Sequence, residues 1–206
     1  MRFMDDCVVI ALFRHGMTEA NQRGAYLGWS NSPLCVPSDY LTAANTYDCH
    51  YSSDLERCRK TAARMFPDKK ITLLKDWREM HFGTWEGKTY EELKNDRHYR
   101  NWIDDPLHYT PPGGESFGQF RTRVERGWKQ IIQDLFSNHL RSCGVMTHGG
   151  VIRYLLSELA PEKKEFWSWQ VPYAKGIELI FKRDMLRRGK RCILLREAPL
   201  TVKELG

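Results

Sequence analysis

Three short segments of the sequence combine histidine, arginine and glycine in a pattern that suits chemistry on a phosphoryl group. They are Arg14-His15-Gly16, residues 54–57 (DLER) and Thr147-His148-Gly149. Guanidinium groups and the backbone N–H groups at helix N-termini both donate hydrogen bonds to phosphate oxygens. If the fold brings the three segments together, two histidines and at least two arginines form a site for a dianionic phosphate.

The stretches before these segments have the patterns of strands. Residues 7–13 (CVVIALF) form a continuous apolar run rich in β-branched residues, which is typical of a strand buried on both faces. Further strands are expected at residues 47–51, 71–74, 144–147, 176–182 and 192–196. Helices are expected over residues 55–66, 89–103, 115–138 and 151–159. Residues 52–54 (SSD) are expected to cap the first of these helices.

Strands that alternate with helices indicate an α/β fold, here a three-layer α/β/α sandwich with a mostly parallel central sheet. Loops at the carboxyl ends of the strands converge in such a fold, so the three segments should meet. With 206 residues, 41% of them hydrophobic, residues 1–206 are expected to form a single domain. The Pro-rich loop 106–114 is expected to be a lid or a rim.

Composition limits the environment and the partners. No run approaches the roughly 20 apolar residues of a membrane helix, and the first residues lack the pattern of an export signal. The cysteines have no metal-site spacing and are expected to be reduced; they are Cys7, Cys35, Cys49, Cys58, Cys143 and Cys192. We therefore expect a cytoplasmic protein that acts without a membrane.

The formal net charge of +6 would suit nucleic acid or a small anionic substrate. The densest basic run, residues 182–191, lies between two β-like stretches, as the connection of a hairpin would. No zinc finger, RNP-like motif or heptad accompanies it, so nucleic acid is not expected as a partner. A small phosphorylated metabolite is the expected partner.

Residues 14–21 (RHGMTEAN) resemble the R-H-G-x-T-x-x-N signature of the histidine phosphatase superfamily, which includes cofactor-dependent phosphoglycerate mutases. Residues 53–57 followed by Thr61-Ala62, residues 78–87 and residues 147–153 resemble its other motifs, in the expected order. The resemblance implies a phosphoglycerate mutase-like fold and a phosphatase that needs no metal and no cofactor.

The resemblance also implies covalent catalysis. Neutral His15 would attack phosphorus in line, and water would then hydrolyse the phosphohistidine. The cations Arg14 and Arg57 should lower the pKa of His15 and so keep it nucleophilic. The phosphate oxygens would be held by Arg14, Asn21, Arg57, His148 and Gly149.

The same resemblance places Glu79 at the scissile oxygen, as an acid in the first step and a base in the second. In the alternative, Glu79 pairs with Arg78 or caps a turn, and Glu86 or Glu115 donates the proton. Glycine follows the second histidine here, where acid phosphatases and phytases have aspartate. This difference indicates the mutase-like branch.

Other residues of suitable type are expected to have ordinary roles. Arg59 competes with Arg57, but only Arg57 has the family spacing, and Arg59 is expected to face solvent. The aromatic side chains expected in the core rather than in the site are Trp85, Trp102, Phe117 and Trp128. The histidines without an assigned role are His50, His81, His98, His108 and His139.

The substrate is less constrained than the chemistry. Residues 77–86, Trp102, residues 112–117 and Arg123-Val124 resemble bacterial alpha-ribazole phosphatases, which act late in cobalamin assembly. Related short members act on sugar phosphates, phosphoglycerates or nucleotides, so the fold does not define the leaving group. Phosphoglycerate mutase activity and a non-catalytic phosphate-recognition module are the alternatives. The full catalytic set argues against the module, and the missing basic pair of the mutases argues against the mutase.

One segment departs from the family pattern. After residues 32–34 the family continues with a long helix that opens L-T-x-x-G-x-x-Q-A, whereas residues 35–46 here include Pro37 and Asp39. That helix is expected to be shortened or lost, which would open one flank of the sheet or alter a dimer surface. The oligomeric state stays open between monomer and homodimer.

Overall fold

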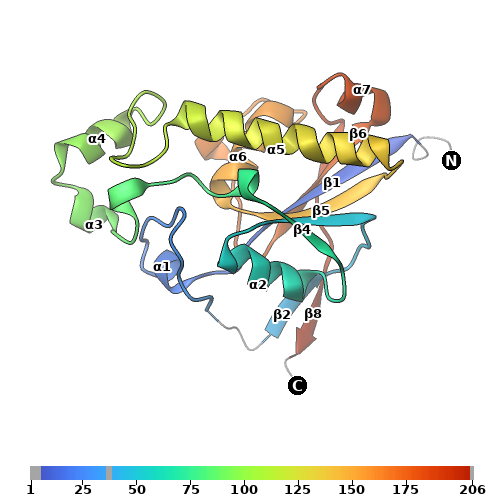
Figure 1. Ribbon diagram of the computed structural model, residues 1–206, viewed down its shortest axis with the longest axis horizontal. Coiled ribbons are helices and arrows are strands. Elements are labelled where there is room, and N and C mark those ends of the chain that lie inside the picture. The colour runs from blue at the N-terminus through green and yellow to red at the C-terminus, as the bar shows by residue number, and fades with distance from the viewer. Residues whose placement is uncertain (1–5, 36–38, 205–206) are drawn as a thin grey trace.

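The computed structural model describes residues 6–35 and 39–204 and contains a six-stranded mixed sheet (Figure 1). Its strands are β1 (Cys7–Arg14), β3 (Cys49–Ser53), β4 (Ile71–Leu74), β5 (Ser142–Thr147), β6 (Gly176–Lys182) and β7 (Leu194–Glu197). Their order across the sheet is β4-β3-β5-β1-β6-β7. The first four are parallel, whereas β6 and β7 run antiparallel to their neighbours. The predicted α/β fold with a mostly parallel sheet is confirmed.

Helices cover both faces of the sheet. The helices α5 (Phe117–Ser137) and α6 (Gly149–Leu159) lie on one face, and α2 (Glu56–Met65) lies on the other (Figure 1). Side chains of β1 alternate between the two layers: Ile10 and Leu12 pack toward α5 and α6, and Ala11 and Phe13 pack toward α2. Burial on both faces explains the continuous apolar run of this strand.

The helix predicted over residues 89–103 is two helices, α3 (Tyr90–Leu93) and α4 (Arg97–Asp104). The Asp96 carboxylate between them accepts the backbone N–H groups of His98 and Tyr99 and so starts a new helix. The remaining short helices are α1 (Glu19–Gln22), α7 (Arg183–Arg187) and the 3₁₀ turns Lys75–Trp77, Gly83–Trp85 and Phe166–Ser168.

One local prediction is wrong. Residues 52–54 do not cap α2, because Leu55 precedes the helix without a side-chain cap and the Asp54 carboxylate binds Arg78 instead. The basic run joins the antiparallel strands β6 and β7, as predicted for the connection of a hairpin, and it contains α7. Arg183 of that helix lies over the Phe136 ring at 4.7 Å, which ties part of the run to the core layer.

The departing segment forms a strand in its described part. Strand β2 (Asp39–Ala43) pairs antiparallel with β8 (Leu200–Glu204), and Pro37 lies outside the described residues. Leu41 and Leu200 pack against the core layer that contains α2, so this flank is covered rather than opened. The loss of the helix is confirmed, and the prediction of an open flank is wrong. None of the helices in residues 6–35 and 39–204 is long and apolar enough to cross a membrane.

Candidate active site

The two histidines of the predicted site meet at the carboxyl ends of β1 and β5. Arg14 ends β1 opposite Thr147 of the neighbouring parallel strand, so His15 and His148 leave the sheet side by side. Their ring centroids are 5.1 Å apart. His15 is 4% exposed and His148, which begins α6, is fully buried. The convergence predicted for these strand ends is confirmed.

The His15 ring has one nitrogen committed and one free for chemistry. Nδ1 lies 2.7 Å from the Gly16 carbonyl oxygen, which can only accept, so Nδ1 carries the proton of the neutral ring. Nε2 then keeps its lone pair. Burial lowers the pKa of His15 well below its ordinary value, and the positive charges of Arg57 and Arg14 lower it further. His15 is therefore a neutral base at physiological pH.

His148 is fixed by the end of β3 and by α2. Its Nε2 lies 2.9 Å from the Ser53 hydroxyl oxygen and 3.3 Å from the Cys58 sulfur. Burial lowers the pKa of His148 well below its ordinary value, and Arg57 and His15 add to this effect. The sequence had not assigned Ser53 or Cys58 any contact with this ring.

These two histidines make the stability depend on pH. The unfolded chain takes up protons on both rings as the pH falls through the ordinary value of 6.5, whereas the folded chain does not. The free energy of unfolding should fall by roughly 1 kcal/mol for each of the two between about pH 7.5 and pH 5.5. Urea unfolding at both values measures the loss. His15→Asn should remove the contribution of one histidine to this decrease in the free energy of unfolding. An unchanged decrease in this variant would contradict the pKa assignment.

Arg57, in the first turn of α2, is 2% exposed. Its terminal nitrogens donate to the backbone carbonyls of Gly28, at 2.5 Å, and Ser30, at 3.0 Å. Its Nε is buried and has no hydrogen-bond partner among the described residues. A buried guanidinium donor of this kind is suited to an anion that approaches His15.

Arg14 repeats this arrangement from the other side. Its guanidinium carbon lies 3.5 Å from the centre of the Tyr173 ring, and Nη1 donates to the Val171 carbonyl. Its Nε is also buried without a partner in the described part of the chain. The site thus offers one unused buried donor from each of two arginines.

Glycines at the start of α6 let two charged side chains lie directly against the helix N-terminus. A Cβ at Gly149 would lie 3.1 Å from the Arg14 guanidinium carbon, and a Cβ at Gly150 would collide with the Glu79 carboxylate. The Glu79 Oε2 atom accepts the Gly150 N–H at 3.0 Å, and Oε1 accepts the Met80 N–H at 3.0 Å. Glu79 is therefore held against the N-terminus of the helix that His148 begins.

The other candidate carboxylates are engaged elsewhere. Arg78 forms a bidentate pair with Asp54, not with Glu79. Glu115 pairs with Arg123 at 2.7 Å.

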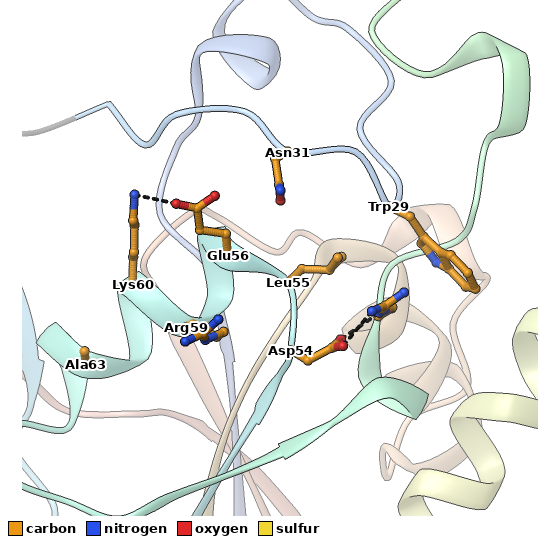
Figure 2. A pocket seen from close by; sticks show the side chains of 9 residues that line it. Trp29, Asn31, Asp54, Leu55, Glu56, Arg59, Lys60 and Ala63 are labelled. Carbon is orange, nitrogen blue, oxygen red and sulfur yellow. Dashed lines mark hydrogen bonds and ion pairs between the residues drawn. The ribbon is translucent and has the colours of Figure 1, made fainter.

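Arg59 is exposed on α2, as predicted, in an open groove on the surface (Figure 2).

A cavity of about 790 Å³ opens beside these groups and is lined by Arg14, Asn21, Glu79 and Gly150. The Asn21 side-chain oxygen accepts the Thr18 hydroxyl at 2.8 Å, which holds this amide at the cavity wall. His15, Arg57 and His148 are buried and are not among the residues that line this cavity.

Aromatic side chains form much of the cavity wall, which was not expected from the sequence. Trp102 and Phe117 were expected in the core alone, yet both line the cavity. Other lining aromatic residues are Tyr26, Phe82, Phe120, Phe166, Trp167 and Tyr173. Trp85 is buried in a separate core cluster and Trp128 packs against the main core, as expected. Apolar composition alone does not distinguish a cavity wall from a core.

The loop 106–114 contributes Pro106 and Leu107 to the cavity, in keeping with a rim. Arg153 of α6 also lines it, a residue that the sequence motif contained without a role. Across residues 6–35 and 39–204, no three His, Cys, Asp or Glu side chains are grouped to hold a metal ion. The positive charge of the site comes from arginine.

A buried neutral histidine beside two arginines, at the strand ends of an α/β sheet, is the arrangement expected of an enzyme that acts on phosphoryl groups. The chain belongs to the histidine phosphatase superfamily (branch 1), whose model matches residues 10–188. It is thus an enzyme of a phosphatase family.

Three proteins of known name or structure are similar to this chain. The adenosylcobalamin/alpha-ribazole phosphatase of Escherichia coli K12 is 30% identical over 172 residues, 78% of this chain and 83% of the relative. The structure of the alpha-ribazole phosphatase from Shigella flexneri matches with a TM-score of 0.72 at 26% identity, over 83% of this chain and 89% of that one. The phosphoglycerate mutase structure from Thermus thermophilus matches with a TM-score of 0.63 at 28% identity, over 94% of this chain and 99% of that one.

Proposed function

We propose that the enzyme hydrolyses a small phosphomonoester through a phosphohistidine on His15, without a metal ion. The observation that carries this proposal is the state of the His15 ring: neutral, with Nδ1 bound to a backbone carbonyl and Nε2 free. A histidine held in this way is prepared for nucleophilic attack.

In the first step, Nε2 of His15 forms a bond to phosphorus and the bond between phosphorus and the ester oxygen breaks. Arg14, Arg57, His148, Asn21 and the N–H of Gly149 hold the phosphoryl oxygens. The buried Nε atoms of the two arginines support this role, because each would gain an acceptor. Charge that develops on these oxygens meets donors that need not reorient.

Glu79 supplies the proton that the departing oxygen needs, because an alkoxide is a poor leaving group. In the second step its carboxylate takes a proton from water, the water oxygen bonds to phosphorus, and the bond from phosphorus to Nε2 breaks. Inorganic phosphate leaves and Glu79 is protonated again. The hydrogen bonds from Gly150 and Met80 support this proposal, because they hold the carboxylate at the cavity wall.

The leaving group that we propose is a ribonucleoside with an aromatic base, as in alpha-ribazole 5′-phosphate. The aromatic cavity wall supports this choice, because a flat apolar base packs on aromatic rings. The names of the relatives from Escherichia coli and Shigella flexneri point the same way. Phosphoglycerate mutase activity is the alternative, which the structural similarity to the Thermus thermophilus mutase supports.

Phosphate release from a panel of esters tests this proposal. The panel contains alpha-ribazole phosphate, 3-phosphoglycerate, a sugar phosphate and nitrophenyl phosphate. We expect the highest kcat/KM for alpha-ribazole phosphate and no change when a chelator is added. Loss of activity with the chelator would contradict the metal-independent mechanism. No phosphate release from any ester would favour a mutase or a binding module.

A further inference from the structure

The phosphate-binding arginine Arg57 is held by backbone, not by a partner carboxylate. Its terminal nitrogens donate to the carbonyls of Leu27, Gly28 and Ser30, at 3.4, 2.5 and 3.0 Å. These carbonyls belong to residues 27–30, a loop between α1 and β2. Loops move more readily than helices and strands, so the aim of this guanidinium depends on what fixes the loop.

Glu86 fixes that loop from its other side. Its Oε1 accepts the N–H of Trp29 at 2.8 Å, and its Oε2 accepts the N–H of Ser30 at 2.6 Å. Oε1 also accepts the N–H of Phe82 at 3.2 Å, which anchors the carboxylate to its own segment. The Glu86 side chain is 6% exposed, so these charge-assisted hydrogen bonds are little weakened by water.

Glycine at position 28 lets the carboxylate in. A Cβ there would collide with Glu86 Oε1 and with the Met80 carbonyl oxygen. The loop thus turns N–H groups toward Glu86 and carbonyl groups toward Arg57. The negative charge of Glu86 also opposes the burial that lowers the pKa of Arg57.

The same loop contacts the proposed proton donor. The Trp29 indole N–H donates to the Glu79 backbone carbonyl at 2.9 Å. The Arg78 guanidinium carbon lies 4.9 Å from the centre of the Trp29 ring, and Arg78 also pairs with Asp54. The loop therefore contacts both the backbone of Glu79, the proposed acid, and the guanidinium of Arg57, the proposed phosphate ligand.

We propose that Glu86 is a positioning residue that aims Arg57 at the phosphoryl group through residues 27–30. The proposal rests on the proposed function, because it takes Arg57 as a ligand of the transferring group. Both carboxylate oxygens of Glu86 already accept backbone N–H groups and the side chain is 6% exposed, so we expect it to act through the loop and not by touching substrate. Its loss should weaken phosphate binding by the same route as the loss of Arg57.

A double-mutant cycle tests this route. The variants are Glu86→Gln, Arg57→Ala and the pair, and the readouts are kcat/KM for nitrophenyl phosphate and the inhibition constant of inorganic phosphate. Glu86→Gln replaces one acceptor with a donor that faces a backbone N–H. It should lower kcat/KM and weaken phosphate inhibition by about 10-fold to 100-fold, as the loss of supporting hydrogen bonds does at other sites. In the Arg57→Ala background the same change should cost less than about twofold.

Glu56→Gln is the matched control. Glu56 lies on the open groove near the same loop, where it pairs with Lys60 (Figure 2). This variant should behave as wild type. Glu86→Asp keeps the charge at a shorter reach, should give an intermediate loss, and replaces the Gln variant if that variant does not fold.

Equal costs of Glu86→Gln with and without Arg57 would overturn this proposal, as would an unchanged phosphate inhibition constant in the single variant. Either result with an active wild type leaves the proposed function intact. A wild type that releases no phosphate would instead overturn the proposed function.

Discussion

The variant His15→Ala is expected to lose phosphatase activity by at least about 10⁴-fold, because it removes the ring nitrogen proposed to form the covalent intermediate. The measurement is kcat/KM for nitrophenyl phosphate, whose leaving group needs no proton. Inorganic phosphate should still bind, since the donors of Arg14 and Arg57 are unchanged. The variant thus separates binding from turnover.

His139→Ala provides the control, because His139 is exposed and precedes the start of β5, whereas the site lies at the other end of that strand. It should retain wild-type activity. A His15→Ala variant that keeps more than about a tenth of the wild-type kcat/KM would contradict the nucleophile assignment.

The variant Glu79→Gln should discriminate between leaving groups. We expect a loss of about 10²-fold to 10⁴-fold on a sugar or nucleoside phosphate, whose alkoxide must be protonated as it departs. On nitrophenyl phosphate the loss should stay below about 10-fold, because the phenolate leaves without a proton. The ratio of the two kcat/KM values measures the effect.

Asp104→Asn is the matched comparison, because Asp104 is another carboxylate that lines the cavity. It should affect the two kinds of substrate alike. If Glu79→Gln also reduced both activities equally, the proton donor would have to be sought elsewhere in the cavity.

The arrangement of the candidate site could be predicted from the sequence because local patterns encode it. A buried strand that stops at Arg14, and another that stops at Thr147, place His15 and His148 at the same edge of a parallel sheet. These features depend on short stretches of chain and one topological rule. The structure adds a reason for glycine at position 149 that was not predicted, the close approach of Arg14.

What the sequence did not predict depends on contacts between distant backbone segments. The carbonyls that hold Arg57 and the N–H groups that bind Glu86 belong to every residue type, so they leave no pattern in the sequence. The position of Trp102 in the cavity wall could not be predicted either, because an apolar side chain gives the same sequence pattern in a core and in a cavity wall. The pairing of β2 with β8 joins segments that lie far apart along the chain.

Trapping the proposed covalent phosphohistidine on His15 tests the mechanism most directly. Enzyme mixed with alpha-ribazole phosphate or nitrophenyl phosphate is quenched in alkali, digested and analysed by mass spectrometry. We predict a mass gain of one phosphoryl group on the peptide that contains His15, and no such gain in His15→Ala. A phosphoryl group on another residue, or active enzyme without any labelled peptide at steady state and in a rapid quench, would contradict the account.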